Sequence, residues 1–166
     1  MYNLQELLNQ IKTALNYKLY HLALNSSLAL PDMCAALQSE DGKTNGRKYA
    51  QWYDTYVGSS SSSLDSQACY RFRCSALHQG HSQHENLGYS RILFVEPNPN
   101  FFFHNNIIND VLNIDINIFC LSIINAVEKW LIIIQDDDNF KKNYPKFIRR
   151  YPNGIAPYIV GIPVIS

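Results

Sequence analysis

The chain has 166 residues, of which 46% are hydrophobic and 17% are charged. This length fits one domain with its own core, and this composition excludes a disordered chain. Fourteen basic and fourteen acidic side chains give a formal net charge of zero, which argues against a protein whose whole surface binds nucleic acid or membranes. Any function must therefore come from a local site.

Helical periodicity dominates the first part of the chain. One amphipathic helix is predicted around the apolar residues Leu4, Leu7, Leu8, Ile11 and Leu15. A second helix is predicted over residues 17–30. Pro31 then fits the first turn of a third, short helix, because a helix makes no use of the N–H group at that position. Residues 40–46 contain the turn-forming residues of a loop.

Two further helices are predicted after this loop. Thr44 or Asn45 is suited to cap the first of them, which carries the aromatic residues Tyr49, Trp52, Tyr53 and Tyr56. The second is predicted over about 65–79, and Gly80 is a natural end for it.

The pattern changes in the second half of the chain. Residues Arg91–Val95 predict a strand, and Phe101–Phe103 are its expected partner across a short turn. A long helix is then predicted from a continuous apolar stripe made by Ile116, Phe119, Cys120, Ile123, Val127, Trp130, Leu131 and Ile134. The prolines and glycines of the last segment, GIAPYIVGIPVIS, forbid a helix, so an extended tail lying across the body is expected.

These elements predict a mainly α fold, a helical bundle with a small β-hairpin element and an extended C-terminal tail. The whole chain, 1–166, is expected to be one domain, in which residues 134–166 are a C-terminal extension packed on the bundle. The apolar segment 107–134 carries charged residues, and the N-terminus lacks the features of a signal peptide, so neither membrane insertion nor export is expected. The four cysteines form no CxxC pair and favour reduced thiols in the cytoplasm.

One segment carries residue types suited to RNA chemistry. Arg73 and His78 are separated by four residues near the end of a predicted helix. RNA can be cut without a metal when its 2′-hydroxyl attacks the neighbouring phosphate. A histidine transfers the proton near neutral pH, and an arginine binds the phosphate through two parallel hydrogen bonds and stabilises the developing charge.

Arg71 is a second candidate for the phosphate-binding arginine. It precedes His78 by seven residues, nearly two helical turns, which places both residues on one face. Arg73 instead lies at the edge of the apolar stripe beside Cys69 and Leu77. A helix that distorts before Gly80 would bring Arg73 to His78, so both arginines stay open at this point.

This segment resembles the HEPN superfamily, helical-bundle domains of prokaryotic defence and toxin systems with an Arg, four to six residues and a His near the end of a core helix. The stretches PDMCAAL, DGKTNGRKYAQWYD, RCSALHQG and PYIVGIPV resemble an uncharacterised bacterial branch. The resemblance implies a homodimer whose two motifs form one cleft, with Arg73 as phosphate clamp and His78 as acid/base group. Polar residues of the loop 40–46 are expected to line that cleft. The sequence departs from the family pattern at Cys74, where family nucleases often carry Asn, Asp or His.

Two main functions follow as hypotheses, and a purely structural interaction domain is a third possibility. The first is a metal-independent endoribonuclease of a toxin or antiviral defence system, with RNA as substrate, no cofactor, and a cognate antitoxin or defence partner. The second is a non-catalytic HEPN-like module that binds RNA, a nucleotide or a partner protein, which Cys74 and the zero net charge favour. Around the catalytic pair Arg73 and His78, the candidate substrate-binding residues are Arg71, Ser75, Gln79, His81, His104 and Asn105.

Two other patterns bear on function. His78, His81 and His84 have regular spacing, but with Cys69 or Cys74 they do not form a zinc motif, because the two tight ligand pairs are missing, so no metal is predicted. Residues 136–151 interleave basic and aromatic side chains. They suit either single-stranded RNA or, as the favoured interpretation, a helix or turn packed on the bundle.

Overall fold

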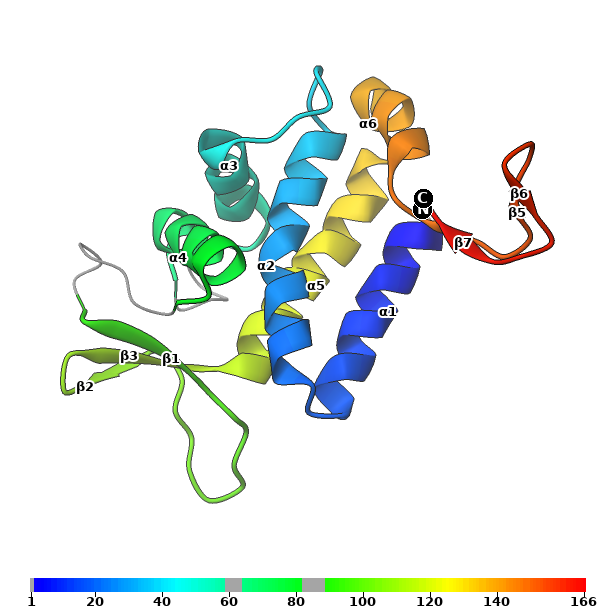
Figure 1. Ribbon diagram of the computed structural model, residues 1–166. Coiled ribbons are helices and arrows are strands. Elements are labelled where there is room, and N and C mark those ends of the chain that lie inside the picture. The colour runs from blue at the N-terminus through cyan, green and yellow to red at the C-terminus, as the bar shows by residue number, and fades with distance from the viewer. Residues whose placement is uncertain (1, 59–63, 82–88) are drawn as a thin grey trace.

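The computed structural model describes residues 2–58, 64–81 and 89–166. Most of these residues are helical, which confirms the predicted mainly α fold. The bundle is built from α1 (Tyr2–Asn16), α2 (Tyr20–Leu37), α3 (Gly46–Tyr56), α4 (Ser66–Gln79) and α5 (Ile116–Ile134). Helix α2 is central, because it packs against α1 and α5 on one side and against α3 and α4 on the other (Figure 1).

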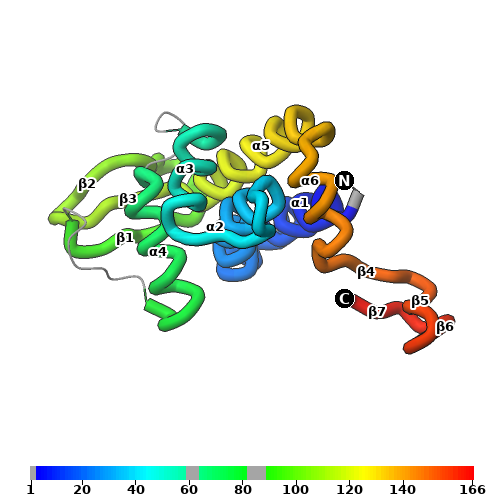
Figure 2. The backbone as a smooth tube through the Cα atoms, turned by 90° about the horizontal axis from the view of Figure 1, so that it is seen from above, coloured from blue at the N-terminus to red at the C-terminus, as the bar shows by residue number. Residues whose placement is uncertain are grey.

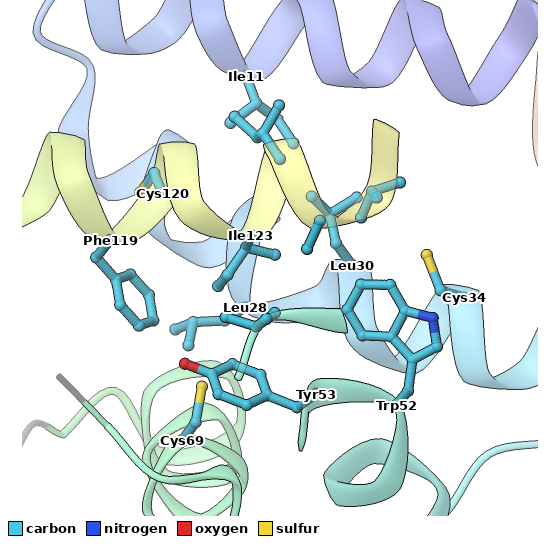
Figure 3. Close-up of a cluster of buried hydrophobic side chains, with 14 of the residues drawn as sticks. Ile11, Leu28, Leu30, Cys34, Trp52, Tyr53, Cys69, Phe119, Cys120 and Ile123 are labelled. Atoms are coloured by element: carbon cyan, nitrogen blue, oxygen red, sulfur yellow. The ribbon is translucent and has the colours of Figure 1, made fainter. Parts of the chain in front are cut away.

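The hydrophobic core lies between these helices. Each of the five contributes buried side chains to it, among them Ile11, Leu28, Trp52, Cys69 and Phe119 (Figure 3). Burying one such large apolar side chain contributes about 1.5–3 kcal/mol, so the matching of apolar stripes is what holds the bundle together.

The predicted helix boundaries of α3 and α4 are confirmed by their caps. Asn45, not Thr44, caps α3, because its side chain accepts a hydrogen bond of 3.0 Å from the Lys48 amide. Asp65 caps α4 by accepting a hydrogen bond of 2.7 Å from the Ala68 amide. Gly80 ends α4 in a left-handed conformation with φ of 71°, which glycine adopts at little cost.

Helix α2 continues through Pro31, so the predicted break into two helices is wrong. Proline removes the N–H group that would bond to the carbonyl of Ser27. The Tyr49 hydroxyl donates a hydrogen bond of 3.3 Å to the Leu28 carbonyl, in the turn that Pro31 disturbs. Residues on both sides, such as Leu28 and Cys34, are buried in the same core, and this packing keeps the helix continuous.

Helix α5 is long and apolar enough to cross a membrane by length and composition alone. Its buried residues, however, face the other helices of the bundle. Phe119, Ile123, Val127 and Trp130 are fully buried there. Helix α5 is therefore the core helix of the bundle.

A three-stranded sheet precedes α5. It consists of β1 (Arg91–Val95), β2 (Asn106–Ile108) and β3 (Val111–Asp115) in the order β1-β3-β2. The predicted strand Arg91–Val95 is confirmed, but its predicted pairing with Phe101–Phe103 is wrong. β1 pairs in parallel with β3, and Phe101 only forms an isolated bridge with Asn98. The reason is burial: Ile114 of β3 is fully buried, whereas Phe101 and Phe102 are 64% and 72% exposed.

The β-hairpin is formed by β2 and β3, which pair in antiparallel fashion. Asn109 and Asp110 connect them with φ values of 50° and 62°. Two consecutive residues with positive φ are typical of a type I′ turn, which suits the twist of a two-residue hairpin.

After α5 the chain forms α6 (Asp138–Asn143) and the 3₁₀ helix η1 (Tyr144–Lys146), which pack on the bundle. Asn143 is buried and binds the C-terminal end of α2. Its side-chain amide donates hydrogen bonds of 3.1 Å and 2.7 Å to the carbonyls of Leu37 and Ser39. These bonds satisfy carbonyl groups at the helix end, where the helix itself has no donors for them.

The last residues form a C-terminal arm, defined here as residues 150–166. Its strands are β4 (Arg150–Tyr151), β5 (Gly154–Ile155), β6 (Ile159–Val160) and β7 (Val164–Ile165). β4 pairs with β7 and β5 with β6, so the arm is extended, as predicted. It does not lie across the body, however, but projects from the bundle (Figures 1 and 2). Its strands pair with one another, which leaves Tyr158 84% and Val160 71% exposed.

Candidate functional site

Helix α4 carries the Arg/His motif beside α2 (Figure 1). Cys69 and Phe72 of α4 are buried in the core, and Arg73 follows at the border between this buried face and solvent. His78 lies in the last turn of the helix and is exposed. The C-terminal end of a helix carries a partial negative charge, which favours a histidine or another cationic side chain there.

The structure brings Arg73, rather than Arg71, to His78. Nη1 of Arg73 lies 3.0 Å from Nε2 of His78, although α4 stays helical to Gln79 and shows no distortion before Gly80. The long arginine side chain spans the gap between the two positions. Since a guanidinium only donates hydrogen bonds, Nε2 of His78 must accept this one. A hydrogen bond in this contact therefore requires a ring that carries its hydrogen on Nδ1.

Asp32 of α2 completes this cluster. Its Oδ2 atom lies 2.6 Å from Nε of Arg73, and the Thr44 hydroxyl donates a hydrogen bond of 3.4 Å to its Oδ1 atom. Asp32 is only 8% exposed. Burial raises the pKa of Asp32 above its usual value, although the charge of Arg73 and the hydrogen bonds from Thr44 and Arg73 act in the opposite direction.

Tyr70 and Cys74 flank Arg73 on α4. Burial and its hydrogen bond with the Cys74 thiol raise the pKa of Tyr70. The start of α3 lies against this tyrosine: a Cβ atom on Gly46 would come within 2.7 Å of the Tyr70 ring. The half-buried Cys74 thus faces a tyrosine, where family nucleases often carry a polar residue beside the arginine.

Several predicted substrate-binding residues also lie at the end of α4. Arg71, Gln79 and His81 are exposed, and Ser75 is buried. The Ser75 carbonyl accepts hydrogen bonds from the amides of Gly80 and His81, the second at 3.3 Å. Ser75 thus closes the helix through its backbone. Gln79 and His81 lie on the surface at the same helix end as His78, whereas Arg71 lies about two turns earlier in α4.

His104 and Asn105 lie in a different part of the structure, before β2. Nδ1 of His104 accepts a hydrogen bond of 3.3 Å from the Asp115 amide at the start of α5, and Asn105 has a positive φ of 55°. Burial lowers the pKa of His104, with Asp115 acting against this shift. These two residues thus belong to the junction between the sheet and α5, whereas Arg73 and His78 lie on α4.

The described residues contain no cluster of three or more side chains suited to a metal ion. His84, one of the three regularly spaced histidines, lies outside the described residues. Cys69 is buried, and its sulfur lies 3.2 Å from the Tyr49 hydroxyl, so it serves the core. Its burial raises the pKa of this thiol to about 12.

The basic and aromatic segment 136–151 packs on the bundle, which confirms the favoured interpretation. Phe140 is buried against Trp130 in an edge-to-face arrangement with ring centroids 5.6 Å apart. Tyr144 stacks between Phe140 and Phe147 at 5.0 Å and 6.0 Å. These rings therefore bind one another, which leaves fewer of their faces for the bases of a nucleic acid.

The deciding feature of this site is thus a chain of three side chains, Asp32–Arg73–His78, formed by two helices. No protein-family model, curated protein or solved structure matches this chain. The chemistry of the site therefore has to follow from its own side chains. A guanidinium binds phosphate, and a neutral imidazole accepts a proton.

The sequence prediction named Arg73 and His78, and it included Thr44 only as a polar residue of the loop 40–46, but it missed Asp32. One signal for Asp32 was present, because it is a carboxylate in the apolar stretch LALPDMCAAL. An ionisable residue inside such a stretch is rarely buried without a charged or hydrogen-bonding partner. The pattern alone does not say which basic residue that partner is.

Proposed function

We propose that this protein is a HEPN-like, metal-independent endoribonuclease of a prokaryotic toxin or antiviral defence system, acting in the cytoplasm as a homodimer. The observation that supports it is the 3.0 Å contact between Arg73 and His78. In this contact a phosphate-binding cation lies beside a proton acceptor at a helix end. A cognate antitoxin or defence protein is the expected partner.

The proposed reaction is a transesterification within RNA. The scissile phosphate binds the Nη groups of Arg73, which then release Nε2 of His78. This nitrogen takes the proton of the 2′-hydroxyl, whose oxygen attacks phosphorus as the bond to the 5′ oxygen breaks. A protonated imidazole, which the second copy supplies in a dimeric cleft, returns a proton to the leaving oxygen. This reaction requires no metal ion, no oxidant and no reductant.

The test is cleavage of a fluorescently labelled single-stranded RNA by the purified protein in EDTA. Arg73→Ala and His78→Ala are each expected to reduce the cleavage rate by about 10²–10⁴-fold, because each removes a group that acts in the transition state. Arg91→Ala and His21→Ala are matched controls, since they change the same residue types at exposed positions outside the proposed site. Both controls are expected to stay within a few-fold of the wild type.

Two outcomes would contradict this proposal. One is cleavage that is equal in the wild type and in both site variants, which would identify a contaminating nuclease. The other is cleavage that EDTA abolishes, which would mean that a metal is required. Circular dichroism of each variant shows whether a loss of activity reflects a loss of fold.

A second candidate function is a non-catalytic module that binds RNA, a nucleotide or a partner protein. The ion pair with Asp32 favours it, because a carboxylate 2.6 Å from Nε already balances the charge of Arg73. The same RNA distinguishes the two functions. Binding that Arg73→Ala weakens, without cleavage by the wild type, supports the binding module and excludes the nuclease.

A further inference from the structure

The position of Asp32 needs an explanation beyond stability. The residue lies in the turn after Pro31, where α2 faces the core, and its neighbours Leu30, Cys34 and Ala35 are buried. A carboxylate in such surroundings is costly unless it is paired. Its burial raises its pKa, so the surroundings disfavour the charged form even with Arg73 present. A neutral side chain of the same shape would therefore suit the fold at least as well.

The geometry shows what the carboxylate does to Arg73. The ion pair engages Nε, on the side edge of the guanidinium, and the contact with His78 engages Nη1 at its end. This contact is an ion pair by distance and not an aligned hydrogen bond. Because a guanidinium is planar and rigid, a carboxylate held against Nε still limits the directions in which both Nη groups can point. The remaining hydrogens on Nη1 and Nη2 then form the end-on fork that binds a phosphate.

The same contact sets the tautomer of His78. Nη1 of Arg73 is the hydrogen-bond partner that the structure gives to this imidazole, so it decides which ring nitrogen carries the hydrogen. Because the guanidinium donates to Nε2, the hydrogen must lie on Nδ1. An imidazole in this form presents Nε2 as a proton acceptor.

We propose that Asp32 is a positioning residue that, by holding Nε of Arg73, orients the phosphate-binding fork and selects the Nδ1–H tautomer of His78. Thr44 extends this arrangement to the loop between α2 and α3, since its hydroxyl binds the same carboxylate. The catalytic importance of Asp32 rests on the proposed ribonuclease function. The tautomer of His78 and the orientation of Arg73 do not depend on that function. Both can be measured without any substrate.

The first experiment is nuclear magnetic resonance of the full-length protein labelled with ¹⁵N, at a pH at which the ring of His78 is neutral. Two-bond ¹H–¹⁵N correlations identify the nitrogen that carries the hydrogen. The wild type is expected to show mainly the Nδ1–H form of His78. Asp32→Asn is expected to shift the ring toward the Nε2–H form, because an amide holds Nε of Arg73 more weakly than a carboxylate does.

Asp54→Asn is the matched control. Asp54 is an exposed aspartate of α3 whose carboxylate accepts a hydrogen bond of 2.9 Å from the Ser66 hydroxyl, at the opposite end of α4 from His78. Its variant is expected to leave the His78 tautomer unchanged. Arg73→Leu removes the Nη1 donor and must give the same shift as Asp32→Asn, so the test remains decisive even where the latter variant folds poorly.

The second experiment measures RNA cleavage by the same variants. Asp32→Asn is expected to lower kcat at least about tenfold through misplacement of Arg73, with a smaller change in KM, while Asp54→Asn keeps the wild-type values. A wild-type tautomer in both Asp32→Asn and Arg73→Leu would overturn the inference. The expected tautomer shift in a protein that cuts no RNA would instead support the positioning role and reject the nuclease.

Discussion

The pair formed by Asp32 and Arg73 shows how one residue can serve a site at the expense of the fold. Removing one partner of a buried ion pair usually leaves an uncompensated charge, which is strongly destabilising. Arg73 has a route to water, because its side chain is 20% exposed, whereas that of Asp32 is 11% exposed. The cost of burial therefore falls mainly on the carboxylate, and the raised pKa of Asp32 expresses this.

This pKa predicts how the effect of Asp32→Asn on stability depends on pH. A carboxyl group with a raised folded-state pKa binds its proton more tightly in the folded than in the unfolded protein. Its contribution to the free energy of unfolding is therefore complete at acidic pH and is lost as the pH rises through the folded-state pKa. The amide of the variant cannot titrate, so the free energy of unfolding of the variant relative to the wild type is expected to be greater at pH 7 than at pH 4.

Urea denaturation of both proteins at the two pH values measures this difference, in which the titrating groups that do not interact with Asp32 cancel. A relative stability of the variant that is greater at pH 4 than at pH 7 would contradict the prediction. It would mean that Arg73 lowers the pKa of Asp32 by more than burial raises it.

Among the elements, α4 depends most on how it ends, because His78 lies in its last turn. Gly80 has a φ of 71°, and a Cβ atom there would meet no other atom within 4 Å. Gly80→Ala is therefore expected to cost roughly 1 kcal/mol of unfolding free energy through backbone strain alone. Gly80→Asn is the control, since asparagine tolerates this conformation better, and it is expected to cost less. Equal stability of the two variants in urea denaturation would contradict this explanation.

Local signals account for most of the elements that were predicted correctly. The apolar stripes of α1 and α5 and the cap at Asp65 act within a few residues, so they can be recognised in the sequence. The signal for the β2–β3 hairpin was also local but was missed: Asn109 and Asp110 separate two apolar pairs. The continuity of α2 could not be recognised in this way, because the contacts that outweigh Pro31 come from other helices.

At the scale of the whole molecule, the bundle and the C-terminal arm differ in how they are stabilised. The bundle has a continuous core, whereas the apolar side chains of the arm, such as Tyr158, Val160 and Ile162, are exposed. Ending the chain after Arg149 is therefore expected to change the free energy of unfolding by less than about 1 kcal/mol, as for other exposed positions.

Thermal and urea denaturation of the shortened protein test this expectation. Phe140→Ala is the control, because its ring is 4% exposed and packs against Trp130. This variant is expected to lose about 3–5 kcal/mol. A comparable loss on removal of the arm would show that the arm belongs to the cooperative folding unit.

The sequence by itself determined most of the helices, their caps and the position of Arg73 and His78 near the end of one of them. These features arise from hydrogen bonds and apolar spacing within a few turns, which a sequence displays directly. Only the tertiary structure decided that Arg73 rather than Arg71 meets His78, and that Asp32 of another helix holds it. It also decided that β1 pairs with β3. The physical reason is the same in each case: these contacts join side chains or strands whose approach is set by the packing of whole elements in a shared core.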